Sequence, residues 1–351
     1  MISFVWELGL PLPAGTGGSE NYTIGHVREL IRRGIAAQVV TVGAGVADGR
    51  DDFADIPFLS LRSANDVGRL DGTVVFVTEF PAIQTRQPAF QFLHIPPPLR
   101  AEEGRRIAAQ TRGRTMIATS QFGAQLWAQF LGVDIDSVHV VYPFAEPCFA
   151  HQVRPVSDPT IVRILYAGRL SPEKGIYTFL EMLHSDLIAP DLNLTFTATT
   201  AGADKPQGRI IHRLLEAHPR VGLVPARKTP KAMAGLMAEH DIVVMPSNGQ
   251  YWHETFGIVS IEAQHAGCRV VASDDGGLPE TDCGDVIFVH PDNSEALALG
   301  IRTVIAEGQL SSSQRQAAAA EFTVEQSVNR LLEVLDQTRF ATATRVAAHA
   351  Y

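Results

Sequence analysis

Several hallmarks of common protein classes are missing from this chain. Its three cysteines, Cys148, Cys268 and Cys283, show neither a metal-ligand spacing nor a disulfide framework. The formal net charge of −9 argues against general nucleic-acid binding, which needs a basic surface. Lysine is rare, because only four of the 29 basic residues are lysines and Lys174 is the first of them. This rarity adds weight to any role for Lys174.

Long hydrophobic runs are also absent. No apolar stretch approaches the about 20 residues that cross a membrane as a helix. The first residues, Ile2–Trp6, are predicted to form a strand and lack the basic segment and apolar run of a secretory signal. We therefore expect a cytoplasmic protein.

Length and hydrophobic patterning indicate two domains. With 351 residues, the chain exceeds the size that one hydrophobic core usually supports. Strand-like runs alternate with helical patterns throughout, which predicts parallel sheets covered by helices. Prolines interrupt this pattern between Tyr142 and Thr160. We place the boundary there, with one domain at residues 1–150 and a second at residues 151–325.

Two glutamates in the second half of the chain share one loop-to-helix segment. The run before them, residues 241–247, is predicted to be a buried strand that is stopped by Pro246. Glu254 then lies in the loop after the strand, and Glu262 lies one to two turns into the next helix. Ligands of open α/β sheets bind at this carboxyl edge, over helix N-termini. On its own, this spacing fits a solvated helix face equally well.

A second segment places two basic residues around a predicted helix start. Residues 161–167 have the character of a central strand, and Ser171 and Pro172 then match the N-cap and the first position of a helix. Arg169 and Lys174 flank this start, where positive charge opposes the helix dipole at a cost of about 0.3–1 kcal/mol each. A charge-assisted hydrogen bond to a bound anion contributes about 1.5–3 kcal/mol. The pattern therefore predicts anion binding.

Two glycine-rich loops follow other predicted strands. Gly17 and Gly18 lie between the first strand and a helix predicted at residues 19–33, and the missing side chains would let a phosphate approach the backbone. Their spacing does not match the dinucleotide-binding fingerprint. The other loop, Ser273–Glu280, follows a strand predicted at residues 269–273. Taken alone, the first is a flexible loop and the second is a turn.

Together, these segments closely resemble the retaining nucleotide-sugar glycosyltransferases of glycosyltransferase family 4, the glycosyl transferases group 1. The family pattern is a glycine pair after the first strand, Gly-Arg-Leu-x-x-x-Lys-Gly, Glu-x7-Glu with Phe-Gly inside it, and Gly-Gly-x-Pro-Glu. All four elements occur here in that order, at residues 17–18, 168–175, 254–262 and 276–280. The resemblance spans nearly the whole chain.

The resemblance implies an α/β protein with the GT-B fold, in which two Rossmann-like domains have parallel sheets that face each other across a cleft. The first domain would hold the acceptor and be completed by a C-terminal helix at about residues 326–351. The second domain would bind the donor. Some relatives dock on anionic membranes through the first domain, so peripheral contact with the inner face of a membrane is one option. Interleaved glutamates favour solvated helix faces for its basic clusters, at Arg28, Arg32, Arg33, Arg100, Arg105, Arg106, Arg112 and Arg114.

The resemblance also assigns roles to individual residues. Glu262 would accept hydrogen bonds from the ribose hydroxyls, and Glu254 would contact hydroxyls of the donor sugar. His94, at the end of a strand predicted at residues 90–94, would face the donor sugar, and backbone groups near Val224 would read the base. The expected catalytic set is Glu254, His94, Arg169 and Lys174. The expected diphosphate ligands are Gly17, Gly18, Arg169, Lys174, Thr255, Phe256, Gly257 and Ile258.

No cofactor and no metal are expected. Transferases of the other major fold, which bind the diphosphate through a metal, usually have an Asp-x-Asp motif. The acidic pairs here, Asp51–Asp52 and Asp274–Asp275, are adjacent and do not match it. Protein cations and backbone N–H groups would stabilise the leaving phosphate instead. In this family the leaving phosphate is usually held to take the acceptor's proton on the same face, so that the anomeric configuration is retained. We expect the two domains to close over the donor and exclude water.

The substrates are less defined than the reaction. A UDP-sugar with a hexosyl group is the first choice of donor and GDP-mannose the next, while the acceptor is an unidentified hydroxyl compound. Two other enzymes of the same fold fit poorly, a UDP-N-acetylglucosamine 2-epimerase and a glycogen-type phosphorylase. A third alternative is a catalytically silent subunit that binds nucleotide or glycan. Such a subunit would be expected to lose Glu254, Arg169 or Lys174, and the chain keeps all three.

Overall fold

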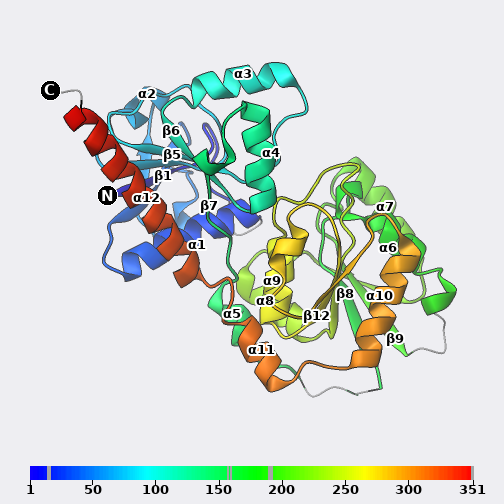
Figure 1. The fold of residues 1–351 in the computed structure, drawn as a ribbon. Helices are drawn as coiled ribbons and strands as arrows, with labels where there is room; N and C mark the ends of the chain where they lie inside the picture. The colour runs from blue at the N-terminus through cyan, green and yellow to red at the C-terminus, as the bar shows by residue number, and fades with distance from the viewer. Residues whose placement is uncertain (14–16, 156–157, 159, 189–192, 349–351) are drawn as a thin grey trace. The chain divides into compact units, whose positions relative to one another are not determined.

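The computed structural model describes the chain except for residues 14–16, 156–157, 159, 189–192 and 349–351. It divides into two compact units, which are Met1–Pro143 with Val324–Tyr351 (unit 1) and Phe144–Thr323 (unit 2). The chain therefore passes between the units twice (Figure 1). Residues 15–16 of the predicted glycine-rich loop and residues 349–351 of the expected C-terminal helix lie outside the described residues.

Unit 1 contains a parallel sheet of seven strands among its described residues, in the order β3-β2-β1-β4-β5-β6-β7. The central strands are buried along their whole length, as parallel strands covered on both faces are. The strands predicted at residues 2–6 and 90–94 are confirmed as β1 and β5. The strand bounds are β1 (Ile2–Val5), β2 (Ala37–Val42), β3 (Phe58–Leu61), β4 (Thr73–Phe76), β5 (Ala89–Leu93), β6 (Arg114–Ala118) and β7 (Val138–Val140).

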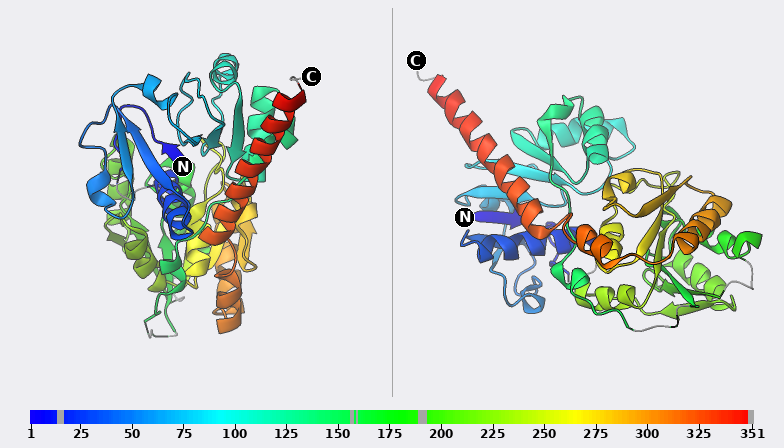
Figure 2. Two further views of the ribbon diagram at one scale, coloured as in Figure 1. Left: turned by 90° about the vertical axis from the view of Figure 1, so that its left-hand side faces the viewer. Right: turned by 60° about the horizontal axis from the view of Figure 1, so that its bottom comes forward.

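The C-terminal helix of unit 1 packs against its first helix (Figure 2). Ser327 Oγ lies 3.1 Å from His26 Nε2 and donates a hydrogen bond to the Tyr142 carbonyl, at 2.6 Å. The structure has a C-terminal helix from Val324, where one was expected at about residues 326–351. The helices of unit 1 are α1 (Gly18–Arg32), α2 (Ala64–Val67), α3 (Ala101–Gln110), α4 (Gln121–Leu131) and α12 (Val324–Ala348), with 3₁₀ turns η1 (Arg50–Asp52) and η2 (Ile135–Ser137).

Unit 2 contains a second parallel sheet, with six described strands in the order β10-β9-β8-β11-β12-β13. Its core places the ring of Tyr166 5.2 Å from that of Phe179, which lies 6.1 Å from that of Phe196. The strands predicted at residues 161–167, 241–247 and 269–273 are confirmed. The strand bounds are β8 (Val162–Tyr166), β9 (Leu194–Thr199), β10 (Val221–Val224), β11 (Ile242–Met245), β12 (Arg269–Ser273) and β13 (Val286–Val289).

Helices cover the second sheet as well (Figure 1). They are α5 (Pro147–Ala150), α6 (Ile176–Met182), α7 (Pro206–Glu216), α8 (Pro230–Ala238), α9 (Ile258–His265), α10 (Ser294–Glu307) and α11 (Ser312–Ala318), with 3₁₀ turns η3 (Pro172–Lys174), η4 (Asp186–Ile188) and η5 (Leu278–Thr281). No helix in the described part of the chain combines the length and the apolarity that crossing a membrane requires.

In each sheet, the first strand in sequence lies in the interior, and later strands lie on both sides of it. In unit 1, β1 lies between β2 and β4, and in unit 2, β8 lies between β9 and β11. The loops after these neighbouring strands leave toward opposite faces of the sheet, which opens a crevice at the carboxyl edge. The two Rossmann-like units therefore each offer one ligand-binding position, and the α/β class expected from the sequence is confirmed.

The predicted helix start at Ser171 is wrong in its details. Ser171 does precede a helical turn, but its side chain forms no cap hydrogen bond, and the turn is the short 3₁₀ element η3. Gly175 then adopts a left-handed conformation, with φ of 66°, and helix α6 begins only at Ile176. A Cβ atom on Gly175 would lie 1.6 Å from the Pro246 carbonyl oxygen, so the close approach of the next loop interrupts the helix.

Replacing Gly175 with alanine is expected to destabilise unit 2 by about 2 kcal/mol or more, because a left-handed residue costs about 1–2 kcal/mol and the clash adds to it. Chemical denaturation measures this loss. Gly132→Ala is the matched control, since Gly132 has the same conformation (φ 67°) with nothing within 4 Å of an added Cβ. Equal losses in the two variants would show that the contact with Pro246 carries no energy.

Candidate active site

The loops after β8 and β11 bring the predicted site residues of unit 2 to one edge. These strands are neighbours, with Val243 paired to Leu165 and Val244 to Tyr166. The loop after β8 carries Arg169 and Lys174, and the loop after β11 carries Glu254. All three residues therefore lie at the carboxyl edge, at the switch point where the strand order reverses.

Lys174 and Glu254 form an ion pair across these two loops. Lys174 Nζ donates to Glu254 Oε1, and Ser247 Oγ donates to the same oxygen at 3.4 Å. The two side chains are 26% and 14% exposed, respectively. The sequence assigned Lys174 to the diphosphate and Glu254 to the sugar, and it did not predict their direct contact.

The buried phenol of Tyr166 shapes the loop that carries both basic residues. Its hydroxyl lies 2.8 Å from the Arg169 carbonyl oxygen and 3.0 Å from that of Lys174. Burial raises the pKa of Tyr166 well above its ordinary value, so the phenol stays protonated and donates. The Arg169 side chain is 64% exposed, and its Nη2 lies 3.3 Å from Glu173 Oε1. Arg169 is thus available to a ligand from solvent.

The glycine pair Gly276–Gly277 holds the loop that carries Glu254. A Cβ atom on Gly276 would lie 2.4 Å from the Glu254 carbonyl oxygen, and one on Gly277 would lie 2.1 Å from that of Thr255. The N–H group of Gly277 donates to the Glu254 carbonyl at 2.8 Å. This element of the sequence pattern therefore has a structural role, because only bare backbone fits beside Glu254.

The backbone N–H groups expected to bind the diphosphate lie at the start of α9. Gly257 precedes the helix with φ of 98°, and no side chain caps this end. An added Cβ on Gly257 would lie 2.5 Å from Leu278 Cδ2. An uncapped helix start at the carboxyl edge of a parallel sheet favours an anion. Thr255, Phe256, Gly257 and Ile258 all belong to this turn.

Glu262 lies inside unit 2 and not on a solvated helix face. It is only 7% exposed, and its carboxyl group has no hydrogen-bond or ion-pair partner within the described residues. Burial, with a smaller contribution from the charge of Glu146, raises the pKa of Glu262 to about 8. An unpaired buried carboxyl group costs stability and is therefore uncommon unless a ligand uses it.

Val224 lies apart from these residues. It ends β10, the edge strand, and three strand spacings separate β10 from β11. At about 4.8 Å per spacing, this is about 14 Å across the sheet. The Val224 carbonyl already accepts a hydrogen bond from the Thr200 N–H group, at 2.9 Å. The base-reading role predicted for backbone groups near Val224 stays a prediction.

In unit 1, a carboxylate lies over the glycine pair. Gly17 precedes α1 in an extended conformation, and Gly18 is the first residue of the helix. A Cβ atom on Gly17 would lie 2.3 Å from Glu20 Oε2, so the Glu20 side chain folds back over the helix start. Burial, and then the charge of Glu7, raises the pKa of Glu20. A phosphate at this position would have to displace the Glu20 side chain.

His94 directly follows β5 and packs among aromatic rings. Its ring lies edge-on to Tyr22, at 5.0 Å between centroids, and 5.4 Å from Phe92. Burial, with a smaller effect of His26, lowers the pKa of His94 to about 3, so the imidazole is neutral near pH 7. A neutral imidazole can donate one hydrogen bond and accept another. Its predicted contact with the donor sugar stays a prediction.

Sequence comparison identifies the family of unit 2. Residues 161–307 match the family model described as glycosyl transferases group 1. These residues form a group 1 glycosyltransferase domain. The D-inositol 3-phosphate glycosyltransferase of Jonesia denitrificans is 30% identical over 240 residues, which cover 60% of this chain and 54% of that protein. The glycogen synthase of Mycobacterium tuberculosis (strain H37Rv) is 32% identical over 201 residues, covering 54% and 42%. The chain spans about half the length of the curated relatives it matches.

Solved structures share the fold of nearly the whole chain. A glycosyltransferase from Rickettsia africae superimposes with a TM-score of 0.77 at 17% identity, covering 96% of this chain and 98% of that one. HepE from Anabaena, solved in complex with UDP, superimposes with a TM-score of 0.74 at 21% identity, covering 96% and 99%. The GT-B-like fold expected from the sequence, with a parallel sheet and covering helices in each unit, is thereby confirmed.

A histidine–aspartate pair in the group 1 domain was missed by sequence reasoning. His253 Nδ1 lies 3.0 Å from Asp275 Oδ1 and 3.1 Å from Oδ2. Gly249 leaves room for the pair, since an added Cβ would lie 2.5 Å from both partners. The pair joins the loop after β11 to the loop after β12. Both loops directly follow neighbouring strands, and this shared position is the signal that could have predicted the pair. It fixes the residue beside Glu254 and thereby limits the movement of that carboxylate.

Proposed function

We propose that this chain transfers a hexosyl group from a nucleoside-diphosphate sugar to a hydroxyl acceptor, with retention at the anomeric carbon and without a metal. The carrying observation is the ion pair of Lys174 with Glu254 at the switch point of the group 1 domain. A cation and a carboxylate at that edge match the two charges that develop as the anomeric C–O bond breaks.

Lys174 is suited to stabilise the leaving diphosphate while it stays paired. Its ammonium group has three N–H donors, so it can bind Glu254 and a phosphate oxygen together. Arg169 adds a second, solvent-accessible cation, and the uncapped start of α9 adds backbone donors. Glu254 would bind hydroxyls of the donor sugar and counter the positive charge that develops on its ring.

The position of Glu262 supports a donor in which the sugar is linked to a nucleotide. A buried carboxyl group without a protein partner can accept hydrogen bonds from two vicinal hydroxyls, which ribose provides. A UDP-sugar is our first choice and GDP-mannose the second, and the UDP-glucose complex of HepE supports the first. A catalytically silent subunit that only binds nucleotide is the alternative that a transfer assay excludes.

The donor class is tested by the thermal stability of the protein with UDP, GDP, ADP and dTDP in metal-free buffer. At about 100 times its dissociation constant, the correct nucleotide should add about 2.7 kcal/mol of stability. We expect UDP to raise the melting temperature of the wild type and to have little effect on Glu262→Ala. No shift with any nucleotide, together with no transfer of a sugar, would contradict the proposed function.

Chelation of divalent metals is expected to leave the transfer rate unchanged, because the proposed phosphate ligands are side-chain cations and backbone N–H groups. The measurement is the rate of nucleoside-diphosphate release with excess EDTA, compared with the rate in Mg²⁺ and in Mn²⁺. NMR of the product then reports the anomeric configuration. Loss of activity in EDTA that Mg²⁺ restores would remove the metal-independent mechanism.

A further inference from the structure

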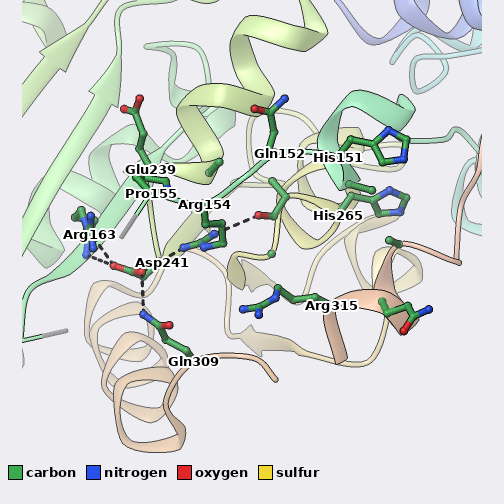
Figure 3. Close-up of a pocket in the computed structure, with 16 residues that line it drawn as sticks. His151, Gln152, Arg154, Pro155, Arg163, Glu239, Asp241, His265, Gln309 and Arg315 are labelled. Atoms are coloured by element: carbon green, nitrogen blue, oxygen red, sulfur yellow. Dashed lines mark hydrogen bonds and ion pairs between the residues drawn. The ribbon is translucent and has the colours of Figure 1, made fainter. Parts of the chain in front are cut away.

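Unit 2 has a cavity at the opposite edge of its sheet from the candidate active site. Arg163 lies at the start of β8, Asp241 directly precedes β11, and Gly267 lies just before β12. These residues lie at the amino ends of their strands, whereas Lys174 and Glu254 follow the carboxyl ends of β8 and β11. The cavity has a volume of about 800 Å³, within the range of small-molecule sites. Figure 3 shows its polar lining.

Asp241 cannot neutralise all of the arginines that line this cavity. Its Oδ1 accepts hydrogen bonds from Arg154 Nη2 at 3.2 Å and from Gln309 Nε2 at 3.3 Å. Its Oδ2 accepts one from the Arg163 backbone N–H at 2.9 Å. Arg163 Nε lies 3.4 Å from Oδ2 and forms no hydrogen bond within the described residues. Asp241 therefore forms ion pairs with two arginines while it carries a single negative charge.

Arg315 brings a third guanidinium without a carboxylate. It lies on α11, and its hydrogen bonds within the described residues go to the Leu310 carbonyl, at 3.0 Å, and to Ser312 Oγ, at 3.5 Å. The other acidic lining residue, Glu239, is exposed, and Figure 3 shows its carboxylate pointing away from Arg315. The cavity thus carries excess positive charge.

The side chains of Arg154 and Arg315 converge over one glycine. Gly267 has φ of 80°, and a Cβ atom there would lie 2.7 Å from Arg315 Cδ and 3.5 Å from Arg154 Cδ. The bare backbone lets both stems pass over the same point. The stems of two arginines therefore lie side by side, and guanidinium groups bind a phosphate with planar, bidentate hydrogen bonds.

We propose that this cavity is a second ligand site that binds a phosphorylated small molecule of the size of a sugar phosphate. The phosphate would be held between Arg315 and Arg154, near Arg163, and the polar remainder of the cavity would hold the hydroxyls. Both connections to unit 1 leave from its lining, one from residues 150–155 toward Phe144 and one from α11 toward Thr323. A ligand that bridges Arg154 and Arg315 would therefore join the two connecting segments.

Binding of fructose 6-phosphate, measured by calorimetry with fructose and inorganic phosphate as the separate parts, tests this proposal. We expect saturable binding of fructose 6-phosphate, weaker binding of inorganic phosphate and none of fructose. Arg315→Gln should weaken binding about tenfold or more, since it removes a charge-assisted hydrogen bond. Arg302→Gln removes an exposed arginine from α10, outside the cavity, and should bind like the wild type.

Amide hydrogen exchange of the wild type, measured with and without fructose 6-phosphate, locates the bound ligand. This measurement does not depend on the variants. We expect fructose 6-phosphate to protect residues 150–155 and 309–319 while exchange around Lys174 and Glu254 stays unchanged. Protection at the latter loops instead would mean that the phosphate occupies the donor site. That result, unchanged binding by Arg315→Gln, or equally tight binding of inorganic phosphate would overturn the proposal. None of these readouts depends on transfer activity.

Discussion

Glu254→Gln is expected to lower the rate of sugar transfer by about a hundredfold or more without weakening the binding of UDP. The amide keeps the size and polarity of the side chain but removes the negative charge that would counter the developing charge on the sugar. It also breaks the ion pair with Lys174, whose ammonium group is then no longer shared with a carboxylate. The dissociation constant of UDP should therefore stay the same or fall.

Lys174→Met is expected to change the affinity for UDP in the opposite direction from Glu254→Gln. The methionine fills similar space but cannot donate to a phosphate, so UDP binding should weaken by about tenfold or more. Turnover should fall as well, because the leaving diphosphate loses a cation. Calorimetry gives the affinities and single-turnover rates give the chemical step.

A neighbouring carboxylate provides the control for both variants. Glu173 pairs with Arg169 at 3.3 Å and is 24% exposed, and its backbone carbonyl accepts a hydrogen bond from the Asn248 N–H group in the loop of Glu254. Glu173→Gln should change the transfer rate by much less than Glu254→Gln. A rate in Glu254→Gln equal to that of the wild type, or UDP binding weakened more than tenfold, would remove Glu254 from the proposed mechanism.

The sequence predicted most of the fold because its patterns are local. Runs rich in β-branched residues gave the positions of β8, β11 and β12, and the alternation of strands with helices gave parallel sheets. The residues of the Gly-Arg-Leu-x-x-x-Lys-Gly and Glu-x7-Glu elements do come together, since β8 and β11 are neighbours. Strand order depends on contacts distant in sequence, and no local pattern of the chain encodes it.

The errors and omissions of the sequence-based predictions also come from contacts between residues that are distant in sequence. Ser171 matches an N-cap by sequence, but the helix begins only after Gly175 because the Pro246 carbonyl occupies the space of a side chain there. The contact of Lys174 with Glu254 joins residues 80 positions apart. Glu262 matched a solvated helix face by spacing alone, and its burial depends on which side of α9 packs inward. Packing between elements decided each of these cases.

The buried state of Glu262 should be measurable as a dependence of stability on pH. In the folded protein the pKa of Glu262 is raised to about 8, whereas the unfolded chain has the ordinary value near 4.5. Between these values the folded state binds one more proton than the unfolded state. The contribution of Glu262 to the free energy of unfolding should therefore fall by about 1.4 kcal/mol per pH unit from about pH 5 to pH 8, and level off above.

Glu262→Gln isolates this contribution, because glutamine does not titrate. The free energy of unfolding of the variant minus that of the wild type should rise with pH up to about pH 8. Burial lowers the pKa of His26 to about 4 and that of His94 to about 3, which makes both proteins more stable as the pH rises to about 6.5. This effect cancels in the difference. Glu181→Gln, which alters an exposed residue of α6, should leave the wild-type profile unchanged.

Nucleotide binding should depend on pH in the opposite direction, because the ionised carboxylate accepts hydrogen bonds from ribose hydroxyls on both oxygens, whereas the protonated form uses one oxygen as a donor. Ligand binding must then release the proton of Glu262, so the dissociation constant of UDP should fall about tenfold per pH unit below pH 7 and become constant above about pH 9. Calorimetry in two buffers of different ionisation enthalpy counts the released protons. Affinity that is independent of pH in the wild type would show that Glu262 does not bind the nucleotide, even if its pKa is raised.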